Sequence, residues 1–162
     1  MEYWDLYDKD KNMLERKAIR GEKLAEEEFH LVVNAWVKNN DGKFLISQRS
    51  ANKTHPLIWE CTGGSALMGE DGLDAAIREL KEELNFDVTR DEGKYLGSTL
   101  RFYPNCNDIL EVWLFTTNNK NQEIKIQEEE VNDYKWATKE EILALKEKNL
   151  FDVNAYFDEV LK

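Results

Sequence analysis

One segment in the middle of the chain has the periodicity of a helix, whereas most apolar segments around it have the character of β-strands. From Gly72 to Leu84 apolar residues recur every three or four positions, as one face of an α-helix requires. These residues are Leu73, Ala76, Ile77, Leu80 and Leu84. Such a helix must bury its apolar face, and the strand-like segments offer a sheet to bury it against. The sequence therefore predicts a helix packed on a sheet.

Strand-like segments lie on both sides of this helix. Residues 29–37 are apolar and β-branched, and an Asp41-Gly42 turn joins them to residues 44–49, which is typical of a hairpin. Residues 3–7 alternate and meet a polar turn at residues 8–12, which predicts a small N-terminal hairpin. Further strands are predicted at residues 95–102, 109–117 and 134–137. Strands before, between and after isolated helices indicate an α+β fold with a mixed β-sheet and helices on both faces.

Two more helices are expected in the C-terminal part. Thr138 and Glu141 have the spacing of a capping box, which predicts that a helix begins there. Residues 153–161 are predicted to form a third helix that closes the chain. No Gly/Ser-rich linker and no repeat of fixed period divides the sequence. We therefore expect one domain over residues 1–162, in which residues 1–28 form an N-terminal hairpin or extension.

The charge and the hydropathy of the chain argue against two kinds of partner, nucleic acid and membrane. The chain has 33 acidic and 22 basic residues, a formal net charge of −11, and the carboxylates are spread along its length. Nucleic acid is therefore not an expected partner, and a polyanionic ligand would need cations supplied from outside. No apolar stretch approaches the ~20 residues that span a bilayer, so no membrane partner is expected either. Two cysteines and no apolar leader predict a cytoplasmic protein with reduced thiols.

Three glutamates occupy a second face of the predicted helix, beside the apolar one. Glu79, Glu82 and Glu83 lie at i, i+3 and i+4, within an arc of about 100°. Repulsion between them costs about 0.2–0.5 kcal/mol per pair, so this face weakens the helix unless a cation bridges it. Carboxylate oxygens of this kind suit Mg²⁺ or Mn²⁺. The alternative is an acidic helix face that is simply solvated.

The spacing around these glutamates resembles the signature of the Nudix hydrolase family. That signature is Gly-x5-Glu-x7-Arg-Glu-(aliphatic)-x-Glu-Glu-x-Gly-(apolar), and the matching residues are Gly64, Glu70, Arg78, Glu79, Leu80, Glu82, Glu83 and Phe86. Asn85 stands where the family has its second Gly. Asn is the next most tolerant residue of the left-handed conformation that follows a helix, so residues 64–86 are still expected to form the loop–helix–loop of the family. The resemblance extends from about Phe29 to Glu141.

The resemblance implies a fold, an activity and a metal site. The fold is an α/β/α sandwich, and the activity is Mg²⁺-dependent hydrolysis of a diphosphate bond in a nucleoside diphosphate linked to another moiety. By position, Glu79, Glu82 and Glu83 would hold the metal together with the carbonyl of Gly64. Arg78 would pair with Glu70 or Glu82 and orient the acidic cluster. The implied partner is a small-molecule diphosphate, and the oligomeric state is left open, a homodimer included.

A second segment resembles the isopentenyl diphosphate isomerases, a subgroup that shares the Nudix fold. Residues 48–59 carry this likeness, and Glu111 matches the glutamate of their catalytic strand. Those isomerases use a Cys and a metal-binding His at the positions of Gly63 and Ser65, whereas Cys61 lies two residues upstream. A hydrolase is therefore expected, with an isomerase-like enzyme and a catalytically silent ligand-binding module as the alternatives.

Glu111 is a further candidate metal ligand that lies outside the signature. On the predicted strand it shares a face with Trp113 and Phe115, so its carboxylate points into a site or into an apolar environment. An unpaired carboxylate in apolar surroundings costs several kcal/mol, whereas a metal would compensate its charge. We therefore expect Glu111 to complete the metal site or to orient the attacking water.

Other polar residues have both a functional and a structural interpretation. Arg49 and Lys53 are candidates to bind substrate phosphate, and solvation of both is the alternative. One of Glu128, Glu129 and Glu130 is a candidate additional catalytic acid, since many Nudix enzymes carry one in this loop. His30 matches a metal ligand of the isomerases, although a structural role is expected more often for a lone histidine at a strand start.

Overall fold

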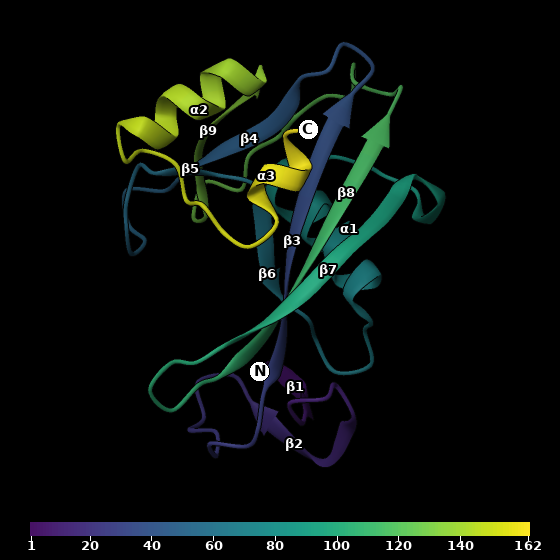
Figure 1. Ribbon diagram of the computed structural model, residues 1–162, viewed down its shortest axis with the longest axis vertical. Helices are drawn as coiled ribbons and strands as arrows, with labels where there is room; N and C mark the ends of the chain where they lie inside the picture. Colours follow the sequence, from purple (N-terminus) through teal and green to yellow (C-terminus); the bar gives the residue numbers. More distant parts are fainter.

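The computed structural model describes all 162 residues, and its centre is a seven-stranded mixed sheet (Figure 1). Strands β3 (His30–Asn39) and β8 (Asp108–Thr117) pair in parallel over their whole length, and every other pair is antiparallel. The remaining strands are β4 (Phe44–Arg49), β5 (Trp59–Glu60), β6 (Thr62–Ser65), β7 (Gly93–Arg101) and β9 (Val131–Ala137). The main strand order is β5-β4-β3-β8-β7, with β6 paired to β3 and β9 to β4.

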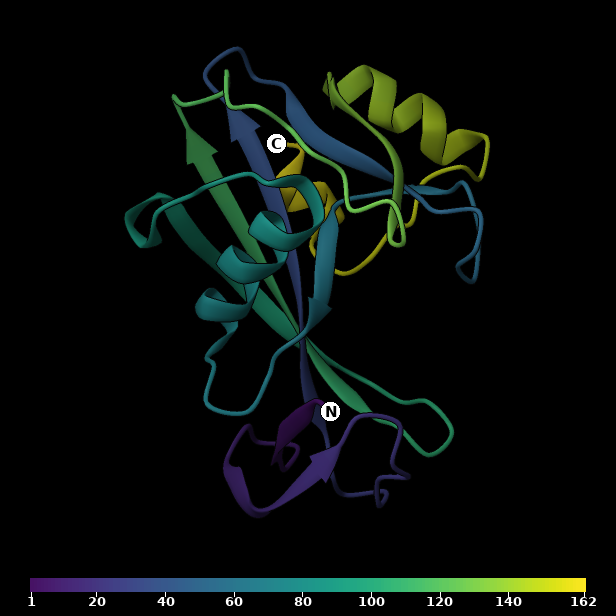
Figure 2. The same cartoon turned by 180° about the vertical axis from the view of Figure 1, so that it is seen from behind.

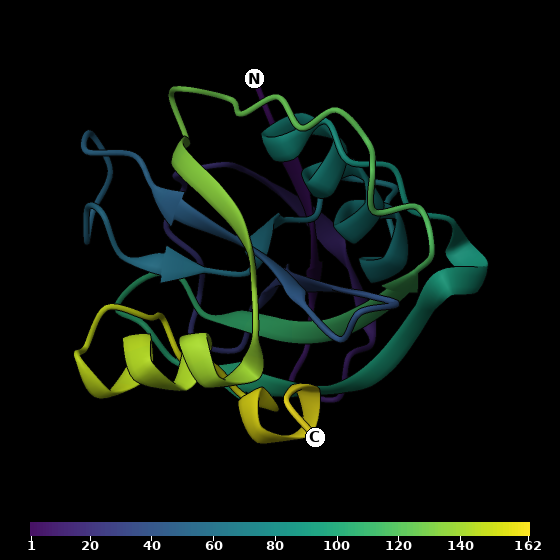
Figure 3. The same cartoon turned by 90° about the horizontal axis from the view of Figure 1, so that it is seen from above.

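Helices cover both faces of this sheet, as the sequence predicts. In Figure 3 helix α1 (Gly72–Leu84) lies on one side of the strands, and α2 (Lys139–Glu147) and α3 (Phe157–Val160) lie on the other. Alternate residues of β3 serve the two layers: Val33 packs with α1, whereas Trp36 packs with the C-terminal helices. A short 3₁₀ turn, η1 (Arg90–Glu92), precedes β7. No helix is long and apolar enough to span a bilayer.

The predicted N-terminal hairpin is a separate two-stranded sheet, β1 (Tyr3–Tyr7) and β2 (Met13–Ile19). Figure 2 shows it at one end of the molecule, below the N-terminal end of α1. Two hydrogen bonds join it to the loop before α1: Met68 N donates to Tyr3 O at 2.8 Å, and Gly69 N donates to the Asp5 carboxylate at 2.8 Å. The hairpin is therefore packed against the loop–helix–loop segment.

Two predictions need correction. The strands on either side of the Asp41-Gly42 turn pair only at Lys38 and Phe44, because β4 then diverges to pair with β9 while β6 takes the place beside β3. The third helix is confined to Phe157–Val160 and does not begin at residue 153. Tyr156 has a left-handed backbone, with φ of 65°, and its hydroxyl donates to the Ser98 carbonyl at 3.2 Å. This anchored residue stops the helix from extending toward its N-terminus.

Helix α1 has the predicted bounds, and both ends are capped. Asp71 accepts a hydrogen bond from Asp74 N at 2.7 Å, and the Asp74 carboxylate accepts one from Asp71 N, which forms a capping box. Asn85 ends the helix with φ of 55° and ψ of 30°, the left-handed conformation predicted from its position in the signature. The exact start and end of α1 therefore follow from local chemistry.

We expect Asn85→Ala to lower the free energy of unfolding by about 1–2 kcal/mol, because alanine has a β-carbon that disfavours the left-handed conformation. Asn85→Gly should retain most of the stability, although it loses the hydrogen bond from Asn85 Nδ2 to Glu123 O. Urea unfolding of the two variants beside the wild type measures both values. Equal stability of the two variants would show that the backbone conformation is not what asparagine provides here.

Candidate active site

The acidic face of α1 lies against strand β6 at Gly64. A β-carbon built on Gly64 would lie 2.3 Å from Glu79 Oε1, closer than any real contact of that kind. Gly64 is paired with Val33 of β3, whose side chain packs in the layer beneath α1. The absence of a side chain at Gly64 therefore lets the Glu79 carboxylate approach the backbone of β6. This is the physical reason for a glycine at the first position of the signature.

Arg78 connects the loop before the helix to the acidic face. Its guanidinium donates to both carboxylate oxygens of Glu70, at 2.7 and 2.9 Å, and to Ser65 O at 3.0 Å. Its Nη1 also donates to Glu79 and to Glu82, at 3.1 Å each. Arg78 thus pairs with both of its expected partners, and its donors are shared among four groups. Its position holds residues 65–70 against α1.

Glu83 is buried and Glu79 is partly buried, and their charges are not fully compensated by the protein. Burial raises the pKa of Glu79 to about 7, against the opposing effect of Arg78. Burial also raises the pKa of Glu83 well above its usual range, and the nearby charge of Glu79 adds to this effect. The Glu83 side chain makes no ion pair. A cation bound between these carboxylates would remove the cost of ionising both.

The glutamates line a cavity of about 190 Å³ that contains no hydrophobic residue. The lining residues are Glu2, Arg20, Lys53, Gly63, Gly64, Ser65, Arg78, Glu79, Glu82, Glu83, Gln127 and Glu130. Five carboxylates and three cationic side chains give the cavity a formal charge of −2, which one divalent cation would balance. The donors are oxygens, the kind that Mg²⁺ and Mn²⁺ prefer, so the residues fit such an ion.

The acidic side chains that line the cavity are not arranged around one common point. No three acidic, histidine or cysteine side chains are arranged to hold a metal together. Arg78 Nη1 lies between Glu79 and Glu82 and pairs with both. Glu82 is half exposed, whereas Glu79 and Glu83 are fixed by burial. Glu82 is therefore the glutamate that can turn from Arg78 toward an ion at the least cost.

Of the two candidate phosphate-binding residues, the structure brings one to the cavity. Lys53 lines it and pairs with Glu130, whereas Glu128 and Glu129 lie outside its lining. Arg49 is not among the lining residues. Its guanidinium donates to Glu60 at 3.2 and 3.3 Å and to Thr54 O at 2.8 Å. These bonds tie the loop after β4 to β5, and Arg49 lines a separate cavity of about 260 Å³, so the structure does not bring it to the acidic cluster.

Comparison with known proteins places this site in a family. A sequence model of the NUDIX domain matches residues 28–158, most of the chain. The protein belongs to the Nudix family. An uncharacterised Nudix hydrolase of Listeria innocua is 36% identical over 155 residues, covering 93% of this chain and 88% of that protein. Nudix hydrolases cleave diphosphate bonds and generally use divalent cations, and this protein is a Nudix-type pyrophosphatase.

Two further comparisons add to this assignment. The isopentenyl-diphosphate delta-isomerase of Shigella boydii is 30% identical over 120 residues, which cover 70% of this chain and 64% of the isomerase. The DR0079 protein of Deinococcus radiodurans has the same fold, with a TM-score of 0.74 at 22% identity over 98% of this chain and 97% of that one. This Nudix protein therefore resembles the isomerase subgroup in sequence.

Glu111 is not at the acidic cluster, contrary to the expectation from the sequence. It is on the predicted face of β8, but its carboxylate lies against Gly72, where an added β-carbon would be 1.8 Å from Oε1. Glu79 to Glu83 follow Gly72 by seven to eleven residues, which is ~10–16 Å along the helix axis. Lys11 pairs with Glu111, and Trp113 Nε1 donates to it at 3.1 Å. The positive charge that compensates Glu111 therefore comes from Lys11, in the turn of the N-terminal hairpin.

Cys61 and His30 are also separate from the cluster. Cys61 is buried among the apolar residues on the opposite face of the sheet from α1, and this burial raises the pKa of its thiol well above the usual range. His30 stacks on Trp4 with ring centroids 3.9 Å apart, and burial is the main cause that lowers its pKa to about 4. Both residues therefore have structural positions in this Nudix fold.

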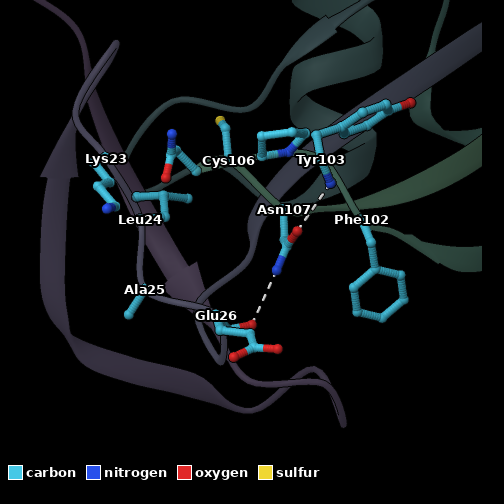
Figure 4. Close-up of a pocket in the computed structure, with 10 residues that line it drawn as sticks. Lys23, Leu24, Ala25, Glu26, Phe102, Tyr103, Cys106 and Asn107 are labelled. Atoms are coloured by element: carbon cyan, nitrogen blue, oxygen red, sulfur yellow. Dashed lines mark hydrogen bonds between the residues drawn. The ribbon is translucent and has the colours of Figure 1, made fainter.

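One larger cavity elsewhere lacks the acidic lining of the site. Figure 4 shows this cavity of about 490 Å³ between residues 23–26 and the loop at residues 102–107, which joins β7 to β8. Asn107 bridges its two sides by donating to Glu26 O at 2.9 Å and accepting from Tyr103 N at 3.0 Å. Glu26 is its only acidic lining residue. A metal site therefore has no basis there.

Outside the signature, sequence reasoning named Lys53 and Glu130 but missed three other cavity residues, Glu2, Arg20 and Gln127. Arg20 and Glu2 come from the N-terminal hairpin, and Gln127 comes from the segment before β9. Gln127 N donates to Glu83 O at 2.9 Å, so this segment runs beside the end of α1. No local pattern marks these residues, because only folding brings them to the helix.

We expect the metal-free protein to lose stability as pH rises from about 4.5 to about 7, the ordinary and folded-state pKa values of Glu79. Within this window the unfolded chain releases a proton that the folded site retains, so the free energy of unfolding falls, by about 3 kcal/mol at most. Urea unfolding in a chelator at pH 5 and pH 8 measures this difference.

Glu79→Gln should reduce this pH dependence, whereas the matched change Glu147→Gln on the exposed surface of α2 should leave it unaltered. Addition of a divalent cation should stabilise the wild type more at pH 8 than at pH 5. The same pH dependence in Glu79→Gln and the wild type would contradict the burial of this carboxyl.

Proposed function

We propose that this Nudix hydrolase is Mg²⁺-dependent and cleaves a diphosphate bond in a nucleoside diphosphate linked to another moiety. The observation that carries the proposal is a pair of carboxylates, the buried Glu83 and the partly buried Glu79, one helical turn apart in an entirely polar cavity. A polyanionic substrate enters such a cavity only with a cation that offsets the negative charge.

Glu79, Glu82 and Glu83 would hold the cation together with the carbonyl of Gly64. When bound, Mg²⁺ supplies positive charge where negative charge develops on the diphosphate. Arg78 keeps Glu79 and the preceding loop in position through the bonds described above. Glu79 is therefore already in position, whereas Glu82 would have to turn from Arg78 to reach the cation.

Glu130 is the candidate for the additional catalytic glutamate, in place of Glu111, and would act as a general base. Its carboxylate lines the cavity and is held by Lys53. In that position Glu130 can accept a proton from the water that attacks phosphorus as the bridging phosphorus–oxygen bond breaks. Lys53 is also the candidate to contact a substrate phosphate, which would replace Glu130 as its partner.

The lining of the cavity favours hydrolysis of a polar substrate over isomerisation of an isoprenoid. No lining residue is hydrophobic, whereas an isoprenoid chain needs apolar side chains around it. Gly63 and Ser65 stand where the isomerases have Cys and His. Cys61 lies on the other face of the sheet and cannot replace the missing thiol without crossing it.

We expect Glu83→Gln to lower kcat by about 10²–10³, because a group that stabilises transition-state charge is lost. A phosphate-release screen over nucleotide sugars, nucleoside di- and triphosphates, dinucleotides and isoprenoid diphosphates, with and without Mg²⁺, identifies the substrate for this assay. Glu129→Gln is the matched control, since Glu129 is exposed outside the cavity. Undiminished turnover by Glu83→Gln would reject the assignment.

With isopentenyl diphosphate and Mg²⁺, the protein should form no dimethylallyl isomer, because no thiol faces the acidic cluster. Chromatography of the products after acid treatment measures this, with a known isomerase as the positive control. Cys61→Ser should also leave the hydrolase activity unchanged. Efficient isomerisation that disappears in Cys61→Ser would instead establish the isomerase alternative.

A further inference from the structure

The N-terminal hairpin brings a cationic side chain to the Nudix cavity. Arg20 follows β2 directly, and its side chain lines the cavity together with Lys53 and Glu79. Glu79 and Glu130 are among the carboxylates whose charges raise the pKa of Arg20, although its hydrogen bond to Glu2 contributes most. Arg20 lies outside residues 28–158, the part matched by the NUDIX domain. The cavity is thus completed by an element that the family model does not include.

The backbone around Arg20 is well anchored. Arg20 N donates to Glu2 O at 3.0 Å, which continues the pairing of the two strands of the hairpin. Within the hairpin, Lys17 Nζ pairs with the buried Asp5 carboxylate at 2.6 Å, and the same carboxylate accepts a hydrogen bond from Gly69 N. Because Gly69 belongs to the loop before α1, Arg20 is held at a fixed place beside the acidic helix.

The cationic side chains of the cavity differ in how firmly they are engaged. The donors of Arg78 are shared among Glu70, Glu79, Glu82 and Ser65 O, so this guanidinium is fully used by the protein. Arg20 pairs with a single carboxylate, that of Glu2, at 2.7 Å. Its side chain is 60% exposed and that of Glu2 is 45% exposed. Exposed pairs of this kind are weak, so Arg20 can exchange Glu2 for a better anion.

We propose that Arg20 binds a phosphate group of the diphosphate substrate and that Glu2 orients its guanidinium until the substrate displaces it. A guanidinium presents two parallel N–H groups that match two phosphate oxygens, which makes phosphate a better partner than one exposed carboxylate. This inference rests on the proposed diphosphate hydrolysis. It adds the N-terminal hairpin to the substrate-binding surface and makes Arg20 a determinant of affinity.

The first test measures binding of methylenediphosphonate, a non-hydrolysable diphosphate, in the presence of Mg²⁺ by isothermal titration calorimetry. The full chain is used, with any affinity tag at the C-terminus because Glu2 lies at the cavity. Arg20→Ala should weaken binding by about 10- to 100-fold, and Arg20→Lys should weaken it less, since lysine keeps the charge but not the paired donors. Lys23→Ala is the matched control, because Lys23 is exposed on the same segment and lies outside the cavity.

The second test uses a variant with an effect of opposite sign. Glu2→Gln removes the competing carboxylate and should tighten binding of methylenediphosphonate by about two- to fivefold. This gain should disappear when the change is combined with Arg20→Ala, because the two residues act as a pair. Damage to the hairpin would weaken binding in both single variants, so the opposite signs separate substrate binding from a structural role.

Kinetics on the best substrate complete the test. Arg20→Ala should raise KM and leave kcat near the wild-type value, as expected for an interaction made equally in the ground and transition states. An active wild type that Arg20→Ala matches in KM and in methylenediphosphonate affinity would overturn the role of Arg20 alone. A wild type that hydrolyses no diphosphate would overturn the proposed function on which that role rests.

Discussion

The approach of the Glu79 carboxylate to the backbone of β6 at Gly64 is the constraint on which the site depends. It requires a glycine on the strand, a helix packed with its acidic edge toward that strand, and an arginine that holds the loop between them. Arg78 meets the last requirement by bonding Glu70 and Ser65 O as well as Glu79. These bonds connect the loop before α1 to the helix that carries Glu79 and the buried Glu83.

The same arrangement makes ionisation of the two carboxyl groups unfavourable. Burial is the main cause that raises the pKa of Glu79 and of Glu83, and the charge of Glu79 adds to the effect on Glu83. A divalent cation held between these carboxylates would offset this cost. The sheet and the apolar face of α1 stabilise the fold against this repulsion, because Leu80 of α1 packs in the same buried cluster as Val33 of β3.

The N-terminal hairpin contributes cationic side chains to the surroundings of the site. Loop–helix–loop and sheet supply the carboxylates, whereas the hairpin supplies Arg20, and its turn supplies Lys11 to Glu111. Asp5 and the backbone at Tyr3 attach the hairpin to the loop before α1, so these cations are tied to the same unit as the glutamates. A segment outside the matched domain is therefore part of the architecture around the site.

The sequence by itself determined the features that depend on local periodicity and local backbone preference. The bounds of α1, its left-handed cap at Asn85, the start of α2 at Thr138 and the two faces of β8 all follow from residues a few positions apart. Only the tertiary structure decided which polar residues meet. Alternation places Glu111 on a face of β8 but does not say where along α1 it lies, and no local pattern connects Arg20 or Glu130 to the helix. These contacts join segments far apart in the chain, and they depend on strand pairing and hairpin packing that sequence periodicity does not encode.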